Sequence, residues 1–321
     1  MCTAVSYNGN KSHYFGRNLD LEVAFQEQVA VTPRNYPFKY RCGLQIEEHY
    51  SMIGMATMCE GYPLYYEATN ECGLSMAGLN FPGIATYLPK CAEKDNIAPF
   101  ELIPWILGQC SNVTEAKDML LRLNVWNMPF SRALPLSPLH WIIADREDSI
   151  VAEPMADGLQ IHDDPFGVVT NNPPFPYHLY HLADYMELSS EQAQNRFCEK
   201  EIKPYSNGMG AMGLPGDYSS ASRFIRAAFV KENSPVDGDD VSQFFHILSS
   251  VAMPRGSILM PNGKHEITLY SCCCDTKNGI YYYTTYDNSR ITAVNMRNCP
   301  LGSCQVITYP LQKAQDIRWE N

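Results

Sequence analysis

The first eighteen residues constrain the fold of this chain more than any other segment. Two candidate strands, Thr3–Tyr7 and His13–Asn18, flank Asn8-Gly9, the residue pair that tight hairpin turns favour. We therefore expect an antiparallel hairpin across this two-residue turn. Its first strand would hold the start of the chain inside a sheet, where a terminus is tied down by backbone pairing.

Cys2 follows Met1 directly, so that loss of Met1 would place a thiol and a free α-amine on one carbon. Their ordinary pKa values, about 8.5 and about 7.7–8.0, are close enough for proton transfer near neutral pH. We therefore predict that Cys2 is a nucleophile whose own amine serves as its base.

Arg17 and Asp20 lie in the segment Gly16-Arg17-Asn18-Leu19-Asp20 at the end of the returning run. If the two runs pair, both side chains come close to the N-terminus. A guanidinium there would favour a thiolate, and a carboxylate could hold or orient the amine. A salt bridge at a strand end would explain the pair as well, but the combination with Cys2 favours a catalytic role.

The rest of the chain is rich in strand patterns, with helical patterns in groups. Helices are expected after Asn112, with an apolar stripe continuing to Leu123, from Ser220 to about Lys231, and after Asp239 as far as Ala252. The further strand candidates are Gln28–Thr32, Tyr50–Thr57, Leu74–Asn80, Leu139–Ala144, Ile150–Glu153, Gly167–Thr170, Ile267–Cys274, Gly279–Thr285, Ile291–Asn295 and Gln305–Tyr309. Hairpin-connected strands with grouped helices predict an α+β architecture of packed antiparallel sheets flanked by helices. Without a linker or repeat, residues 1–321 read as a single domain.

Composition excludes several classes of partner. A net charge of −11, without a cluster of Lys and Arg, argues against binding nucleic acid. The sequence contains no run of 18 apolar residues, so we expect no membrane span. The N-terminus lacks the basic and apolar regions of a signal peptide, which predicts a cytoplasmic protein with reduced thiols.

The twelve cysteines do not have the spacing of a metal site. No Cys-x-x-Cys pair occurs, and adjacent residues in the run Cys272-Cys273-Cys274 would point to opposite faces of a strand. Structural thiols are therefore expected, with no metal ligand set.

Several short motifs together resemble the choloylglycine hydrolases, the family of N-terminal nucleophile hydrolases that includes bile salt hydrolases and penicillin V acylases. The resemblance is colinear from Cys2 to about Tyr286. Its motifs are Met-Cys-Thr at 1–3, Phe-Gly-Arg-Asn-Leu-Asp at 15–20, Asn-Glu-Cys-Gly-Leu at 70–74, Ala-Gly-Leu-Asn-Phe-Pro at 77–82, Val-Thr-Asn-Asn-Pro at 169–173 and Gly-Leu-Pro-Gly-Asp-Tyr-Ser-Ser-Ala-Ser-Arg-Phe at 213–224.

The resemblance implies a four-layer αββα sandwich and a role for six positions, all present without substitution. Cys2 would be the nucleophile, supported by Arg17 and Asp20. The side-chain amide of Asn171 and the backbone N–H of Asn80 would bind the oxyanion, and Arg223 would organise the site. Taken singly, Asn171 could instead be a turn residue, Asn80 a strand-end cap and Arg223 a charge on a helix surface.

The resemblance also suggests a substrate. Bile salt hydrolases resemble this chain in having Asn at position 80, where penicillin V acylases often have Tyr. The expected reaction is hydrolysis of glycine- or taurine-conjugated bile salts through a thioester, without metal or cofactor, in a homotetramer. Apolar candidates for the walls of a steroid pocket are Leu19, Phe25, Cys59, Phe81, Leu134 and Leu136, each of which could equally be ordinary core or loop packing.

Three alternatives remain open at this point. The same chemistry could act on penicillin V or on other N-acyl compounds, such as acyl homoserine lactones. A chain of this kind could also bind amphipathic acids without cleaving them. A third possibility, given the twelve cysteines, is a thiol-rich metal-binding protein.

Overall fold

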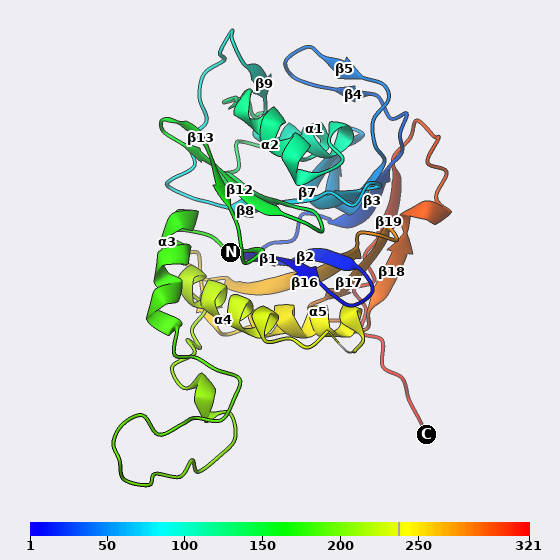
Figure 1. Cartoon of the computed structure of the whole chain (residues 1–321). Helices are drawn as coiled ribbons and strands as arrows, with labels where there is room; N and C mark the ends of the chain where they lie inside the picture. The colour runs from blue at the N-terminus through cyan, green and yellow to red at the C-terminus, as the bar shows by residue number, and fades with distance from the viewer. Residues whose placement is uncertain (237) are drawn as a thin grey trace.

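Two antiparallel sheets stack face to face and hold the N-terminus at their interface (Figure 1). The computed structural model describes residues 1–236 and 238–321. The first sheet has the order β14 (Val168–Val169), β1 (Cys2–Asn8), β2 (His13–Leu21), β16 (His265–Asp275), β17 (Ile280–Thr285) and β18 (Thr292–Asn295), with β15 (Ile258–Leu259) also on β16.

The second sheet brings together strands from both ends of the sequence. Its order is β13 (Gly158–Asp163), β12 (Ser149–Met155), β11 (Leu139–Ala144), β8 (Ser75–Asn80), β7 (Tyr62–Asn70), β6 (Met52–Cys59), β3 (Gln28–Thr32) and β19 (Ile307–Pro310). Outside the two sheets, β4 (Phe38–Lys39) pairs with β5 (Gln45–Ile46), and β9 (Asp95–Ile97) pairs in parallel with β10 (Leu123–Val125).

Helices cover the outer face of each sheet, which confirms the expected αββα order of layers (Figure 1). The helices α1 (Leu102–Gln109) and α2 (Val113–Leu121) lie over the second sheet. On the other side, α4 (Ser220–Glu232) and α5 (Asp240–Ser249) cover the first sheet, and α3 (Phe175–His181) stands beside α4 at the edge of the molecule. The two helical layers give each sheet an apolar partner on its outer face, as layered packing requires.

The opening hairpin forms as expected, but its loop is longer than two residues. Cys2 pairs with Leu19 and Val5 with Gly16, while the residues between Asn8 and His13 form a four-residue loop. In this loop the backbone N–H groups of Asn10 and Lys11 donate to the Asp240 carboxylate at 3.2 and 2.9 Å. The prediction of a two-residue turn was wrong because this contact with the start of α5 holds the loop open.

Strand alternation divides the hairpin into two chemically different faces. Arg17 faces the second sheet, where its Nη1 donates to the carbonyl of Gly78 at 2.5 Å. Its neighbour Asn18 faces the helical layer and donates to the carbonyl of Leu248 at 2.9 Å. Cys2, paired with Leu19, shares the parity of Arg17 and therefore lies on the face between the sheets.

A β-bulge in β16 aims two side chains in opposite directions. The register against β2 shifts between Thr268 and Tyr270. Thr268 therefore donates to Asp20 Oδ1 at 2.5 Å, whereas the Tyr270 hydroxyl donates to Glu67 Oε2 at 2.8 Å. Bulges of this kind often re-aim side chains next to active sites.

Some elements carried no clear pattern in the sequence. The segment of α1 is apolar on every side and contains Pro104, so it has no stripe of helical period. Strand β7 contains Pro63, which reads as a break. The stripe expected to reach Leu123 ends with α2 at Leu121, because Leu123 pairs with Asp95 in β10. β13 and α3 were not expected either.

Across residues 1–236 and 238–321, none of the helices combines the length and the apolar character that crossing a bilayer demands.

Replacing Gly16 by Ala should destabilise the fold. A Cβ at this position would lie 1.9 Å from the carbonyl oxygen of Cys272 in the neighbouring strand, and a backbone atom cannot move aside cheaply. We expect a loss of about 1–3 kcal/mol in the free energy of unfolding, measured by urea denaturation. Gly302→Ala, where the added Cβ meets open space, is the control and should change stability by less than half as much.

The buried carboxyl of Asp164 should make stability fall as the pH rises. Burial raises the pKa of Asp164 to about 7 from an ordinary value of 3.8, against weaker lowering by its hydrogen bond to the N–H of Phe166 and the charge of Lys231. The folded state therefore retains a proton that the unfolded state loses, and stability decreases from about pH 4 to pH 7. In Asp164→Asn this part of the slope should disappear in urea midpoints measured across that range; an unchanged slope would contradict the assignment.

Candidate active site

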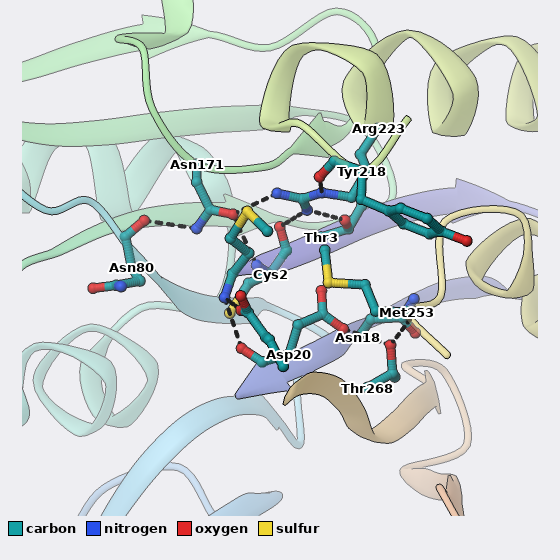
Figure 2. A network of polar contacts seen from close by, with 12 residues as sticks. Cys2, Thr3, Asn18, Asp20, Asn80, Asn171, Tyr218, Arg223, Met253 and Thr268 are labelled. Atoms are coloured by element: carbon teal, nitrogen blue, oxygen red, sulfur yellow. Dashed lines mark hydrogen bonds and ion pairs between the residues drawn. The ribbon is translucent and has the colours of Figure 1, made fainter. Parts of the chain in front are cut away.

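Cys2 stands at the first position of β1 and is 3% exposed. Its backbone N–H donates to Oδ1 of Asn171 at 2.8 Å (Figure 2). Asn171 follows β14, the strand that pairs with β1, so sheet pairing brings two residues 169 positions apart into contact.

Asn171 connects three parts of the site through one side chain. Its Oδ1 accepts from Cys2 and also from Nη2 of Arg223 at 2.8 Å. Its Nδ2 donates to the backbone carbonyl of Asn80 at 2.6 Å. An amide nitrogen carries two hydrogens, so the second one stays free to donate to a substrate oxygen.

Asn80 ends β8 at the edge facing Asn171 (Figure 2). The backbone N–H of the next residue, Phe81, donates to the carbonyl of Pro138 at 2.7 Å. Asn80 and its register partner Leu139 therefore form a non-hydrogen-bonded pair of the antiparallel ladder. The N–H and C=O of one strand residue point to the same side. Because its C=O meets Asn171, the N–H of Asn80 is directed to the same edge.

Arg223 is buried at the start of α4, in the turn capped by Ser219. Its Nη1 donates to the carbonyl of Cys2 and, at 2.7 Å, to Oγ1 of Thr3, while Nε donates to the carbonyl of Tyr218 at 3.0 Å. Burial lowers the pKa of Arg223, and the charge of Asp20 opposes that change. The structure therefore excludes a role as a charge on a helix surface.

Arg17 approaches Cys2 from the face between the sheets. Besides Gly78, it contacts the carbonyl of Tyr66 at 3.2 Å, and its Nε lies 3.8 Å from Oε2 of Glu67. Burial raises the pKa of Glu67, which the positive charge of Arg17 opposes. Two buried guanidinium groups thus place positive charge on either side of Cys2, where an anion formed during a reaction would be stabilised.

Asp20 lies beside the terminal amine. The ammonium of Met1 donates to the backbone carbonyl of Asp20 at 2.7 Å and contacts the buried carboxylate of Glu266. Burial lowers the pKa of this ammonium and raises the pKa of Asp20. Oδ2 of Asp20 is buried and has no hydrogen-bond partner among the described residues.

All six predicted catalytic residues therefore gather around the start of β1, whereas the six predicted pocket residues have varied surroundings. Leu19 is buried opposite Cys2, and Phe81 is buried against the ring of His140. The side chain of Phe25 is 50% exposed, and Cys59, Leu134 and Leu136 are partly buried. A cavity of about 570 Å³ lies instead on the helical side, where Tyr218, Met253 and Thr268 line it.

The residues that support the predicted six were not predicted from the sequence. Glu67 and Glu266 are buried carboxylates within strands, and Thr268 reaches Asp20 only because of the bulge in β16. A charged residue within an otherwise apolar strand would have indicated such a role. Glu67 could not be found in this way, because β7 was not predicted as a strand. No group of three or more His, Cys, Asp or Glu residues suited to a metal ion occurs in the parts of the chain described here.

Comparison with known proteins gives a consistent family. The profile of the linear amide C–N hydrolases, choloylglycine hydrolase family, matches residues 2–309. The bile salt hydrolase/transferase of Lactiplantibacillus plantarum is 51% identical over 316 residues, covering 97% of each chain. A mutant of the conjugated bile acid hydrolase from Clostridium perfringens superposes with a TM-score of 0.94 at 35% identity over the whole of both chains.

Penicillin V acylase from Agrobacterium tumefaciens has the same fold, with a TM-score of 0.76 at 19% identity over 96% of this chain and 91% of that one. The extent of the profile match and the identity to the Lactiplantibacillus plantarum protein establish the family, with the αββα layers and the gathered site in agreement. This chain belongs to the linear amide C–N hydrolases of the choloylglycine hydrolase family.

Proposed function

We propose that this protein hydrolyses the amide bond of glycine- or taurine-conjugated bile salts, with Cys2 as the nucleophile. The observation that carries the proposal is the hydrogen-bonded set of Cys2, Asn171, Asn80 and Arg223 at the end of β1. The names of the relatives, bile salt hydrolase/transferase and conjugated bile acid hydrolase, support this choice of substrate.

In the first step, the sulfur of Cys2 attacks the amide carbonyl carbon and the carbonyl π electrons move onto oxygen. The free hydrogen on Nδ2 of Asn171 and the N–H of Asn80 would donate to that oxyanion. Loss of one such donor typically costs 10²–10³-fold in rate, about 3–4 kcal/mol. Arg223 holds Asn171 and the backbone of Cys2 together, so it would fix the donor relative to the nucleophile.

The α-amine of Cys2, free once Met1 is removed, would manage the protons. It takes the thiol proton and passes it to the leaving nitrogen as the carbon–nitrogen bond breaks, leaving a thioester. The same amine then accepts a proton from water, which attacks the thioester and releases the bile acid and the thiol. Asp20 would orient this amine; in the chain that carries Met1, the backbone carbonyl of Asp20 accepts from the Met1 ammonium.

Burial supports the amine as a base. In the chain that carries Met1, burial lowers the pKa of the terminal ammonium; Cys2 and Asp20 oppose this change, and the charges of Arg223 and Arg17 act in the same direction as burial. An amine on Cys2 would lie one residue deeper, next to Asn171 Oδ1. The neutral form needed for proton transfer is therefore favoured at this site.

The six apolar residues Leu19, Phe25, Cys59, Phe81, Leu134 and Leu136 remain proposed contacts of the steroid. Cytoplasmic location belongs to the same proposal, and the twelve unpaired thiols support it because such thiols persist in reducing compartments. Assembly as a homotetramer is likewise proposed. The segment between α3 and α4 supports it, since it extends away from the body with Met186, Phe197 and Tyr205 more than 80% exposed (Figure 1).

Retention of Met1 should abolish turnover. A peptide nitrogen on Cys2 is not basic, so the base is lost although the thiol remains, and we expect kcat to fall by about 10²–10⁴-fold. The test compares a chain freed from an N-terminal tag so that it begins at Cys2 with the same chain carrying Met1, each verified by intact mass.

Incubation with a conjugated bile salt should add a bile acyl group only to the chain that begins at Cys2. Cys2→Ala, prepared in the same way, provides the inactive control. Turnover by the form carrying Met1 at more than a tenth of the processed rate would contradict the assignment of the base.

Bile salts should be better substrates than penicillin V. We expect kcat/KM on glycocholate or taurocholate to exceed that on penicillin V by at least tenfold, because Asn stands at position 80 where penicillin V acylases often have Tyr. Steady-state rates on the three compounds give the answer. Fast cleavage of penicillin V with negligible release of glycine or taurine would transfer the assignment to penicillin V, and binding without any cleavage would indicate a non-catalytic carrier.

A further inference from the structure

His140 is a buried residue that contacts a chain neighbour of each proposed oxyanion donor, although it is not itself a donor. It lies on β11 of the second sheet and is 1% exposed. Its register partner is Leu79, which belongs to the apolar core between the two sheets, so the imidazole lies on that inner face.

The imidazole spans the gap between the sheets. Its Nε2 lies 3.0 Å from the carbonyl of Thr170, the residue directly before Asn171 at the end of β14 in the first sheet. Its ring stacks on Phe81, directly after Asn80, with the ring centres 4.3 Å apart and the planes 2° from parallel. One side chain thus touches the immediate neighbours of both proposed oxyanion donors.

Both ring nitrogens of His140 face hydrogen-bond acceptors. Nδ1 lies 3.0 Å from the Glu153 carboxylate on the adjacent strand β12, and Nε2 faces the Thr170 carbonyl. A carbonyl and an ionised carboxylate only accept, so the imidazole is the donor in a hydrogen bond to either of them. The two contacts at opposite ends of the ring hold it in one orientation.

Glu153 is held in the ionised form that this pairing requires. Burial alone would raise the pKa of Glu153, but the hydrogen bond from His140 and the nearby imidazole of His162 bring it down to about 2. The N–H of Phe175 at the start of α3 also donates to both of its carboxylate oxygens, at 3.0 and 3.1 Å. The Nδ1 side of the His140 ring is therefore fixed within the second sheet, and its Nε2 side reaches the first sheet.

We propose that His140 is the positioning residue of the oxyanion site, setting the distance between Asn80 on the second sheet and Asn171 on the first. This role rests on the proposed amide hydrolysis and extends it. Because the two donors come from different sheets, a small sliding of one sheet over the other would separate them. A misplacement of about 1 Å can cost around 10²-fold in rate.

The proposed effect is partial, since other contacts also join the two segments. Nδ2 of Asn171 donates to the Asn80 carbonyl, and Nδ2 of Asn172 donates to the Pro82 carbonyl at 2.7 Å. His178 donates from Nε2 to the Asn171 carbonyl from the side of α3. Of these side chains, His140 is the one fixed by a buried carboxylate within the second sheet.

Two substitutions separate the contact with Thr170 from the contact with Glu153. Asparagine reproduces the position of Nδ1, so His140→Asn would keep a donor toward Glu153 and lose the bridge to Thr170. Glutamine reproduces the position of Nε2, so His140→Gln would keep the bridge. His162→Asn is the matched control. His162, on β13, lies 3.6 Å from the Glu153 carboxylate, but it is not hydrogen-bonded to Thr170 or stacked on Phe81.

The experiment measures kcat and KM on glycocholate or taurocholate for the processed enzymes, together with the rate at which iodoacetamide alkylates Cys2. We expect His140→Asn to lower kcat by 10- to 100-fold with KM within threefold of wild type. His140→Gln should retain at least fivefold more activity than His140→Asn, and His162→Asn should stay within twofold of wild type. Alkylation needs no oxyanion donor, so its rate should stay within twofold in every variant.

Three outcomes would overturn the proposal: a kcat of His140→Asn within threefold of wild type, an equal loss in His162→Asn, or an alkylation rate that falls as far as kcat. If His140→Asn does not fold, the double variant His140→Asn with Glu153→Gln replaces it, because it removes the buried charge of Glu153. The same limits on kcat and on the alkylation rate then apply to the double variant. Wild-type enzyme that cleaves only penicillin V would overturn the bile-salt assignment alone, and the variants would then be compared on penicillin V. Wild-type enzyme that cleaves no amide would overturn both the proposed function and the role of His140.

Discussion

The guanidinium of Arg223 is the interaction on which the geometry of the site depends. It binds the carbonyl of Cys2, the hydroxyl of Thr3, the amide oxygen of Asn171 and the carbonyl of Tyr218 at once. Burying such a charge is costly unless each of its hydrogens has a partner. The surrounding backbone must therefore adopt the arrangement that supplies these acceptors. The position of the first strand, of the loop after β14 and of the start of α4 is fixed by that requirement.

Irregularities in the strands position the other polar groups around the site. The bulge in β16 turns Thr268 toward Asp20 and Tyr270 toward Glu67, so that one strand serves both faces of the first sheet. A second shift of register, in β7 opposite β6, occurs beside Tyr66, whose carbonyl accepts from Arg17. Regular pairing would satisfy these backbone groups within the ladder and leave Arg17 with fewer acceptors.

Local patterns predicted the features that depend on near neighbours. The opening hairpin, the caps at Asn112 and Asp239, and most strands follow from turn residues, alternation and capping chemistry. Cys2, Arg17 and Asp20 were predicted from the opening hairpin itself. Asn80, Asn171 and Arg223 were found because family motifs mark them, since spacing alone could not join Cys2 to Asn171. The supporting residues Glu67, Thr268 and His140 escaped because their role depends on contacts between strands far apart in sequence. The all-apolar segment of α1 escaped because a helix buried on every side has no polar face to reveal its period.

The order of strands in the first sheet also determines when the site around Cys2 can fold during translation. β2 pairs with β16, whose residues are synthesised about 250 positions later, and the edge of the second sheet closes only when β19 reaches β3. At the usual 5–20 residues per second, that interval is on the order of tens of seconds. For that interval, the sheet around β1 and β2 therefore lacks β16, and the thiol of Cys2 has none of its late-arriving neighbours. Under the proposed mechanism, Met1 would be removed most readily in this interval, before the centre closes around Cys2.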